Sequence, residues 1–194
     1  MVQTRIKGPA RRERLLDAAA QIVLKHGVAA VTMEAVALLN GVNRAMAYRY
    51  FADRDDLLTA LLDQEYARQT AHVTANVDAT KDLEGALRYA LRHWFRHGEL
   101  FRRLATDTGP LAARAAAIRR EDALLWAEGM QERFELPHDA ALRLAAFAVG
   151  GSFGVFEAQD RDDERIVDEV VRCVMAAGEA LRDAYAPRAE ARRR

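Results

Sequence analysis

The segment from Thr32 to Phe51 constrains the fold more than any other part of the chain, because it carries the signals for two short helices joined by a sharp turn. Thr32 has a hydroxyl that can cap the free N–H groups of a first helix, and Glu34 places a negative charge in the positive first turn of that helix. Gly41 tolerates the positive φ at which many helices end. The sequence therefore predicts a helix that ends at Asn40, directly before this glycine.

A second helix is expected directly after the turn, from Arg44 to Tyr50. Val42 can fill the angle between the two helices, and Asn43 can cap the second one. Its outer face would carry the cationic and amphipathic side chains Arg44, Met46, Tyr48 and Arg49. Such a helix can enter the major groove of DNA while the helix before it crosses the phosphate backbone. The pattern thus predicts a helix-turn-helix.

Helices are also predicted on both sides of this motif. Apolar residues recur at spacings of three and four from Arg11 to His26, and Gly27 can provide a C-cap. After the motif, Asp53 can cap a helix whose apolar face consists of Leu57, Leu58, Leu61 and Leu62. We therefore expect a DNA-binding domain over residues 11–62, preceded by a flexible basic arm over residues 1–10.

The net charge of zero conceals an uneven distribution. Residues 1–54 hold nine Lys or Arg against four Asp or Glu, a net charge of +5, so the remaining residues sum to −5. Clustered cations suit a domain that neutralises DNA phosphates. Two interpretations of Arg5 and Lys7 in the arm stay open. They either belong to a terminus without a role, or they contact phosphates and the minor groove of DNA.

Composition narrows the class of protein further. A chain of 194 residues can bury a core without crosslinks, and a single cysteine, Cys173, cannot form an internal disulfide. The sequence has neither a leading apolar segment nor a run of about twenty apolar residues, so we expect a cytoplasmic protein that does not interact with membranes. Its high Ala, Leu, Arg and Glu content, with 4 Pro and 11 Gly, favours an all-α fold.

The residues after the DNA-binding domain predict a larger helical domain over 63–187, followed by a basic tail over 188–194. Helices are expected over residues 82–97, 99–106, 111–135, 138–156 and 163–185. The first, second and third of these are expected to be inner helices of that domain, and the third to be covered on two faces. Regulation and dimerisation are assigned to this part of the chain.

The last two helices are predicted to form a dimer interface. Glycines thin one side of the first of them, which allows another backbone to approach closely, and valines form a stripe on the second. The predicted interface consists of Phe147, Gly150, Gly151, Gly154, Val167, Val170, Val171 and Val174. An ordinary intramolecular core is the alternative.

A cavity for a small-molecule effector is expected in the same domain, because ligand sites favour aromatic walls with few polar groups. The candidate lining residues are Trp94, Phe101, Trp126, Met130, Phe147 and Phe153, with His93 or His97 as polar anchors. Core packing is an open alternative for each of them.

No arrangement of residues in the sequence predicts catalysis. There is no Gly-rich phosphate loop, nucleophile elbow or zinc-type cysteine pair. His93 and His97 have the spacing of metal ligands on one helix, but no Cys, Asp or Glu nearby completes a coordination shell. We therefore expect neither an enzyme nor a bound metal or cofactor.

The residues around the turn resemble the DNA-binding domain of the tetracycline-repressor (TetR) family of bacterial regulators. The resemblance covers residues 11–62 and rests on the order Gly41-Val42-Asn43, Tyr48, Phe51, Asp53-Arg54-Asp55 and Leu57-Leu58. It implies a homodimeric repressor that binds a palindromic operator in double-stranded DNA, on the bacterial nucleoid, and leaves it when an effector binds.

The resemblance also implies particular DNA contacts. Thr32, Tyr48 and Arg54 would hold phosphates, and Tyr50 takes a place often filled by a phosphate-binding histidine. Arg44 would reach a base edge, with guanine as the expected partner because its O6 and N7 accept two hydrogen bonds from arginine. The predicted DNA-binding set is completed by Asn43, Ala45, Met46 and Arg49.

Three residues depart from the family pattern, so the operator sequence cannot be transferred from relatives. Ala45 stands where Gly is frequent, Met46 where Thr is frequent, and Ala47 where a larger apolar residue is common. Met46 either contacts a thymine methyl or fills space beside the backbone. For Arg54, the alternative to a phosphate contact is a surface ion pair with one of the aspartates that follow it.

Two other functions stay open. A nonspecific DNA-binding protein would show salt-sensitive binding with little preference among sequences. A helical enzyme or carrier with a vestigial DNA-binding domain would bind or convert a ligand without retaining DNA. The net charge of +5 over residues 1–54 argues against the second alternative but not against the first.

Overall fold

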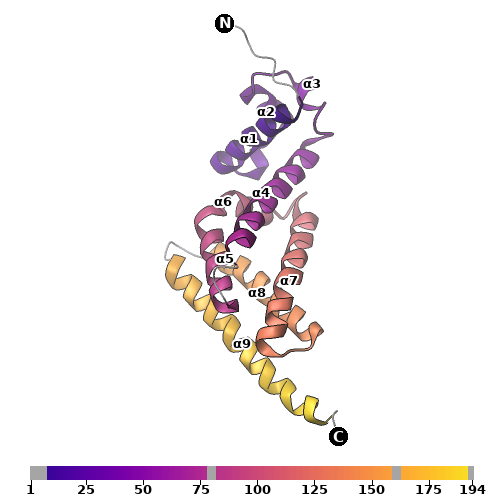
Figure 1. Ribbon diagram of the computed structural model, residues 1–194. Coiled ribbons are helices and arrows are strands. Elements are labelled where there is room, and N and C mark those ends of the chain that lie inside the picture. Colours follow the sequence, from indigo (N-terminus) through magenta and orange to yellow (C-terminus); the bar gives the residue numbers. More distant parts are fainter. Residues whose placement is uncertain (1–7, 78–81, 159–162, 192–194) are drawn as a thin grey trace. The chain divides into compact units, whose positions relative to one another are not determined.

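A computed structural model describes residues 8–77, 82–158 and 163–191, and within these ranges the chain is all-α (Figure 1). This confirms the fold class expected from the sequence. The elements are α1 (Pro9–His26), the 3₁₀ helix η1 (Val28–Ala30), α2 (Met33–Leu39), α3 (Arg44–Ala47), α4 (Arg54–Val77), α5 (Leu83–His97), α6 (Glu99–Ala105), α7 (Ala112–Phe134), α8 (His138–Ala158) and α9 (Asp163–Ala191).

The chain divides into two compact units. Unit 1 comprises residues 1–68 and 99–115, and unit 2 comprises residues 69–98 and 116–194. Helix α6, expected among the inner helices of the larger domain, therefore belongs to unit 1. Two contacts explain this position. The ring of Phe101 stacks on Tyr66 with centroids 6.1 Å apart, and Arg103 donates a hydrogen bond to the Val23 carbonyl at the end of α1.

The core of unit 1 forms where the leucines of α1 and α4 and the aromatic residue after α3 are enclosed. The fully buried side chains include Leu15, Leu16, Phe51, Leu57, Leu58 and Leu62. Burying such a side chain contributes about 1.5–3 kcal/mol relative to leaving it exposed. The Asn40 amide adds a polar link, because it donates to the carbonyls of Arg14 in α1 and Val36 in α2. The two helices are thereby held together at the end of α2.

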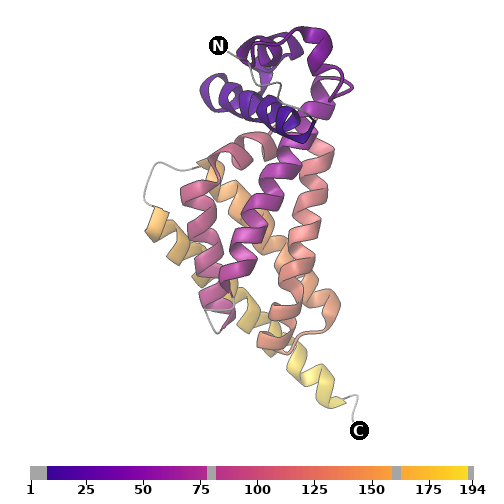
Figure 2. The same cartoon turned by 45° about the horizontal axis from the view of Figure 1, so that its top comes forward.

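The core of unit 2 is built from α5, α7, α8 and α9. Figure 2 shows α9, in yellow, running past α5 and α8, the two helices with which it packs most extensively. Met130 and Phe134 of α7 are fully buried in this core. Gly178 of α9 makes room for the Phe134 ring, since a Cβ at that position would lie 2.3 Å from Phe134 Cζ.

Ion pairs join α5 to α9 along their exposed edge. Arg88 lies 2.6 Å from Asp168, and Glu164 accepts from both Arg92 and Arg96. Partly exposed pairs of this kind contribute at most about 1 kcal/mol each, so the apolar core supplies most of the packing free energy. Among the described residues, no helix combines the length and apolar character required to cross a bilayer.

Candidate nucleic-acid interface and ligand cavity

The turn between α2 and α3 forms as its residues predict. Thr32 Oγ1 accepts a hydrogen bond of 3.1 Å from the Ala35 N–H and so caps α2. Gly41 adopts a φ of 62°, and the N–H groups of Gly41 and Val42 bond back to the last turn of α2. Because residues other than Gly rarely adopt this φ, the glycine sets the angle at which the chain leaves the helix. The sharp bend and both helix starts are confirmed.

Helix α3 begins as predicted but is shorter. Asn43 Oδ1 accepts a 2.9 Å hydrogen bond from the Met46 N–H, yet the regular helix ends at Ala47 instead of Tyr50. The N–H groups of Arg49 and Tyr50 bond three residues back, and the chain turns inward so that Phe51 reaches the core of unit 1. The need to bury Phe51 therefore ends the helix early.

The outward face of this segment carries most of the predicted DNA-binding side chains. Arg44, Ala45, Tyr48 and Arg49 are exposed, whereas Met46 and Tyr50 are half-buried. Thr32 and Asn43 are exposed at the two helix starts. Arg5 and Lys7 lie outside the described residues. The geometry gathers an exposed set of cations and hydroxyls on one short segment, which is suited to phosphates and base edges.

Arg44 is held by two partners in the free protein. Its Nη1 lies 2.6 Å from Glu34 Oε1 of α2, and its Nη2 donates a 3.0 Å hydrogen bond to the Tyr48 hydroxyl. The hydrogen bond with Tyr48 and the charge of Glu34, in that order, raise the pKa of the Arg44 guanidinium above its ordinary value. Glu34 was assigned only a helix-start role from the sequence. Its pairing with Arg44 positions the predicted base-reading side chain.

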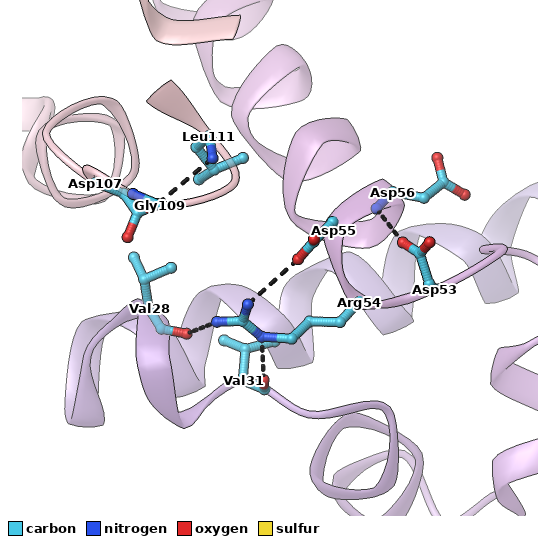
Figure 3. A network of polar contacts seen from close by, with 9 residues as sticks. All are labelled: Val28, Val31, Asp53, Arg54, Asp55, Asp56, Asp107, Gly109 and Leu111. Carbon is cyan, nitrogen blue, oxygen red and sulfur yellow. Dashed lines mark hydrogen bonds and ion pairs between the residues drawn. The ribbon is translucent and has the colours of Figure 1, made fainter. Parts of the chain in front are cut away.

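Arg54 at the start of α4 makes three intramolecular contacts (Figure 3). Its Nε donates to the Val31 carbonyl at 2.7 Å, its Nη2 donates to the Val28 carbonyl at 2.9 Å, and its Nη1 lies 3.3 Å from Asp55 Oδ1. The pairing with Asp55 was one of the two roles considered from the sequence, whereas the two carbonyl contacts were not. The phosphate contact stays a prediction, which two further N–H groups of the guanidinium could serve.

The start of α4 is also capped within its own turn. Asp53 Oδ1 accepts from the Asp56 N–H at 2.8 Å, and Asp56 accepts in turn from the Ala52 N–H at 2.8 Å. This reciprocal pair resembles a capping box, in which two free N–H groups are satisfied together. Figure 3 also shows Asp107, which accepts from the Gly109 and Leu111 N–H groups and closes the turn between α6 and α7.

A cavity of about 230 Å³ opens between α4, α5 and α7 within unit 2. Two of the predicted lining residues, Trp94 and Trp126, form part of its wall. The others are Thr70, Val73, Thr74, Val77, Asp122 and Leu125, which were not among the predicted lining residues. The four α4 residues lie at positions i, i+3, i+4 and i+7, which is one face of a helix. That spacing is the signal that could have found them.

The remaining predicted lining residues lie elsewhere. Phe101 and Met130 are enclosed in the cores of unit 1 and unit 2, respectively. Phe147 is 64% exposed, and Phe153 is half-buried beneath the Arg119 guanidinium, 5.7 Å from its ring centroid. None of the four lines the cavity, because periodicity does not distinguish a side chain that fills a core from one that borders a void.

His93 and His97 face the contact between α4 and α5 instead of the cavity. His93 Nε2 lies 2.5 Å from Gln69 Oε1, and its ring stacks on His72 with centroids 4.2 Å apart. Gln69 Nε2 donates to the His97 carbonyl. These histidines therefore join two helices. No group of three His, Cys, Asp or Glu within the described part of the chain is arranged to hold a metal ion.

The predicted dimer interface divides into two sets of residues. Val167, Val171 and Val174 are buried in the core of unit 2, where they pack within the chain, so for them the intramolecular alternative is correct. Phe147, Gly150, Gly151 and Gly154 are exposed on α8, and Val170 is half-buried. A Cβ added at any of the three glycines would meet no atom within 4 Å. Within the part of the chain that the structure describes, no side chain therefore packs against these three glycines.

A second correction concerns α7. The helix was expected to be covered on two faces, and Ile118, Met130 and Phe134 are indeed buried. Leu125 is 62% exposed at the rim of the cavity, and Leu124 is exposed beside it. One predicted apolar face is therefore only partly covered, because part of it borders the cavity instead of another helix.

Taken together, the all-α fold, the glycine-centred bend and the exposed cationic face of α3 define a protein of the helix-turn-helix class. Residues 15–61 match the family model for bacterial regulatory proteins of the tetR family. The match covers about a quarter of the chain, so the part that is similar to this family is the segment that carries the helix-turn-helix.

Two known proteins are similar to this chain, one over a short segment and the other over most of its length. Over 54 residues it is 41% identical to the HTH-type transcriptional regulator BetI of Rhizobium meliloti (strain 1021), a segment that is 28% of this chain and 27% of that protein. The match thus spans about a quarter of that curated relative. The solved structure of the multidrug binding protein EbrR complexed with imidazole is 29% identical, with a TM-score of 0.64 over 86% of this chain and 96% of that chain.

The fold of the whole chain is shared more widely than its sequence. The structure of FadR from Bacillus subtilis in complex with stearoyl-CoA has a TM-score of 0.67 at 14% identity, covering 84% of this chain and 96% of that chain. At this level of identity the likeness concerns the fold alone. It indicates that the helices after the DNA-binding motif, and not only the motif, follow the architecture found in these regulators.

Proposed function

We propose that the chain is a homodimeric transcriptional repressor that binds a palindromic operator and is released from it by a small-molecule effector. The observation that carries this proposal is the exposed face of α3 and the turn after it, where Arg44, Tyr48 and Arg49 lie beside a capped and sharply angled helix pair. The match of residues 15–61 to the tetR family model supports the same reading. The protein would act in the cytoplasm, on the nucleoid when bound to DNA.

DNA recognition is assigned to two sets of contacts. Thr32, Tyr48, Tyr50 and Arg54 would hold phosphates and set the register, since phosphate contacts position a protein without reading sequence. Arg44 would read a base edge, after exchanging its contact with Glu34 for one with guanine. The remaining predicted contacts are Asn43, Ala45, Met46, Arg49 and the arm residues Arg5 and Lys7.

Dimerisation is assigned to the exposed face of α8 together with α9. A groove of about 430 Å³ lies along these two helices, lined by Phe147, Leu144 and Leu181 and flanked by Arg143 and Tyr185. Exposed apolar surface of this kind often marks a protein interface. A twofold copy would also double the length of DNA that is read, which a single short helix cannot do.

The effector is assigned to the cavity between α4, α5 and α7. Helix α4 supplies four of its lining residues and begins at Arg54, whose guanidinium holds the backbone just before α2. A ligand shifts an equilibrium only when it binds one state better than the other. A displacement of α4 by a bound molecule would therefore reach the residues that hold the DNA-binding helices.

The test is to select bound fragments from the source genome with the purified full-length protein. The proposal predicts a small set of fragments that share an inverted repeat, two chains bound per site, and loss of binding on adding an effector. Binding to all fragments alike would support the nonspecific DNA-binding alternative. Retention of no DNA at all would support the enzyme or carrier alternative.

A further inference from the structure

Glu34 lies in the first turn of α2 and contacts α3 across the turn of the motif. Its side chain is 55% exposed, and its Oε1 lies 2.6 Å from Nη1 of Arg44. The other end nitrogen of that guanidinium, Nη2, donates to the Tyr48 hydroxyl at 3.0 Å. The Glu34 carboxylate is therefore placed directly beside the group that is proposed to read a base.

A carboxylate at this position contributes little to the stability of the fold. Thr32 Oγ1 already accepts from the Ala35 N–H and caps α2. A negative charge favours the first turn of a helix, and an ion pair adds to this, but both effects are small between exposed side chains. The phosphates of DNA repel a carboxylate beside Arg44, so it weakens binding to any DNA that offers it no hydrogen-bond donor.

A G·C base pair offers such a donor beside the guanine that Arg44 is proposed to contact. In the major groove, guanine presents the acceptors O6 and N7, and cytosine presents its N4 amino group, from which Glu or Asp side chains accept. Guanine O6 and cytosine N4 are hydrogen-bonded to each other, so they lie about 2.9 Å apart. The 2.6 Å between Glu34 Oε1 and Arg44 Nη1 is close to that spacing. One acceptor and one donor on the protein thus match a donor and an acceptor on a single base pair.

We propose that Glu34 is a second base-reading residue, whose carboxylate accepts a hydrogen bond from N4 of the cytosine paired with the guanine that Arg44 contacts. The inference rests on the proposed function, since it requires α3 to enter the major groove. On binding, the two side chains exchange their mutual contact for contacts with the two bases, so each charge keeps a partner. A base pair without the cytosine amino group in this place leaves the carboxylate unpaired near phosphates, and that sequence is rejected.

A modified base tests this contact without altering the guanine. N4-methylcytosine still pairs with guanine, but its methyl group takes the place of the N–H that faces the major groove. Each cytosine of an operator selected with the full-length protein is replaced in turn, and the affinity is measured by fluorescence anisotropy. We expect one cytosine in each half-site at which the modification weakens binding about tenfold, opposite the guanine whose contact is lost in Arg44→Ala.

Substitutions of Glu34 show whether this sensitivity depends on the carboxylate. Glu34→Ala removes the acceptor and should reduce the effect of the modified cytosine to less than about twofold. Glu34→Gln keeps a neutral, weaker acceptor and should reduce it to about threefold, which provides a second reading if Glu34→Ala fails to fold. Glu13→Ala is the matched control, because it removes an exposed carboxylate of α1 from the same unit and should leave the tenfold effect unchanged.

The possible outcomes separate this inference from the proposed function. An equal effect of the modified cytosine in Glu34→Ala would show that the methyl group acts by steric exclusion alone. That result, the absence of any sensitive cytosine, or a sensitive cytosine in a different base pair would overturn the inference and leave sequence-specific binding intact. If selection recovers no specific site, the inference and the proposed function are both wrong.

Discussion

Replacing Arg54 by lysine or glutamine separates two roles of this side chain. The guanidinium spans the Val28 and Val31 carbonyls with bonds of 2.9 and 2.7 Å, and it is about one-third exposed at 32%. A hydrogen bond from a charged donor contributes about 1.5–3 kcal/mol, and partial exposure reduces this. We therefore expect Arg54→Gln to lower the free energy of unfolding by about 2–3 kcal/mol. Loss of the exposed contact with Asp55 should contribute little to this change.

Lysine keeps the positive charge but presents a single ammonium group, which cannot reproduce the planar fork that reaches both carbonyls. Arg54→Lys should therefore lose about 1–2 kcal/mol of stability in urea denaturation. A phosphate contact, by contrast, would tolerate lysine and would show as a salt-dependence slope that falls by about one unit only in Arg54→Gln. Stability of Arg54→Lys equal to that of the unsubstituted protein would refute the structural role.

Three other substitutions test separate parts of the account. Glu34→Gln, which releases Arg44 and removes a negative charge beside it, should raise the affinity for nonspecific DNA by about threefold at low salt, measured by fluorescence anisotropy; an unchanged affinity would contradict this. Gly151→Leu should convert dimers to monomers in sedimentation without unfolding the chain, because no atom lies within 4 Å of an added Cβ; a variant that still dimerises would place the interface elsewhere. Gly178→Ala should destabilise unit 2 by about 1–3 kcal/mol, because the added methyl group would overlap with Phe134. Gly129→Ala is the control and should not destabilise the protein, because its Cβ would lie 3.5 Å from a leucine methyl. Equal melting curves for the two variants would contradict the packing of Phe134 against Gly178.

Local signals in the sequence predicted the starts of four helices correctly, whereas α1 begins at Pro9, two residues before the expected Arg11. The caps at Thr32, Asn43, Asp53 and Asp82 all form hydrogen bonds to N–H groups three residues ahead. Each cap depends on a few consecutive residues and on the free N–H groups at a helix N-terminus. Gly41 is similar, because its φ is a property of one residue. Such features can be inferred without knowing what packs nearby.

Features that depend on distant residues were predicted less well. The carbonyls that Arg54 contacts lie more than twenty residues earlier in the chain, and the contact between Arg44 and Glu34 crosses the turn. Likewise, the apolar stripe of α9 was correct, but a stripe does not show whether its valines face their own core or a second chain. For Val167 and Val171 it is their own core.

The residues that line the cavity were also predicted only in part from the sequence. Trp94 and Trp126 were selected as aromatic, and they do line it, whereas Met130 is equally apolar and lies in the core. The polar residues that give the wall its character, Thr70 and Asp122, carry no signal as single residues. Only their helical spacing relative to the neighbouring valines and tryptophans places them on one surface.

Methylation interference on a selected DNA site would test most directly whether α3 reads bases as one half of a twofold pair. We predict one guanine in each half-site whose N7 methylation blocks binding of the protein, with the two positions related by inversion symmetry and separated by whole helical turns. Arg44→Ala should bind more weakly and lose the sensitivity at those two guanines alone. Interference at no guanine, or the same pattern with Arg44→Ala, would contradict it.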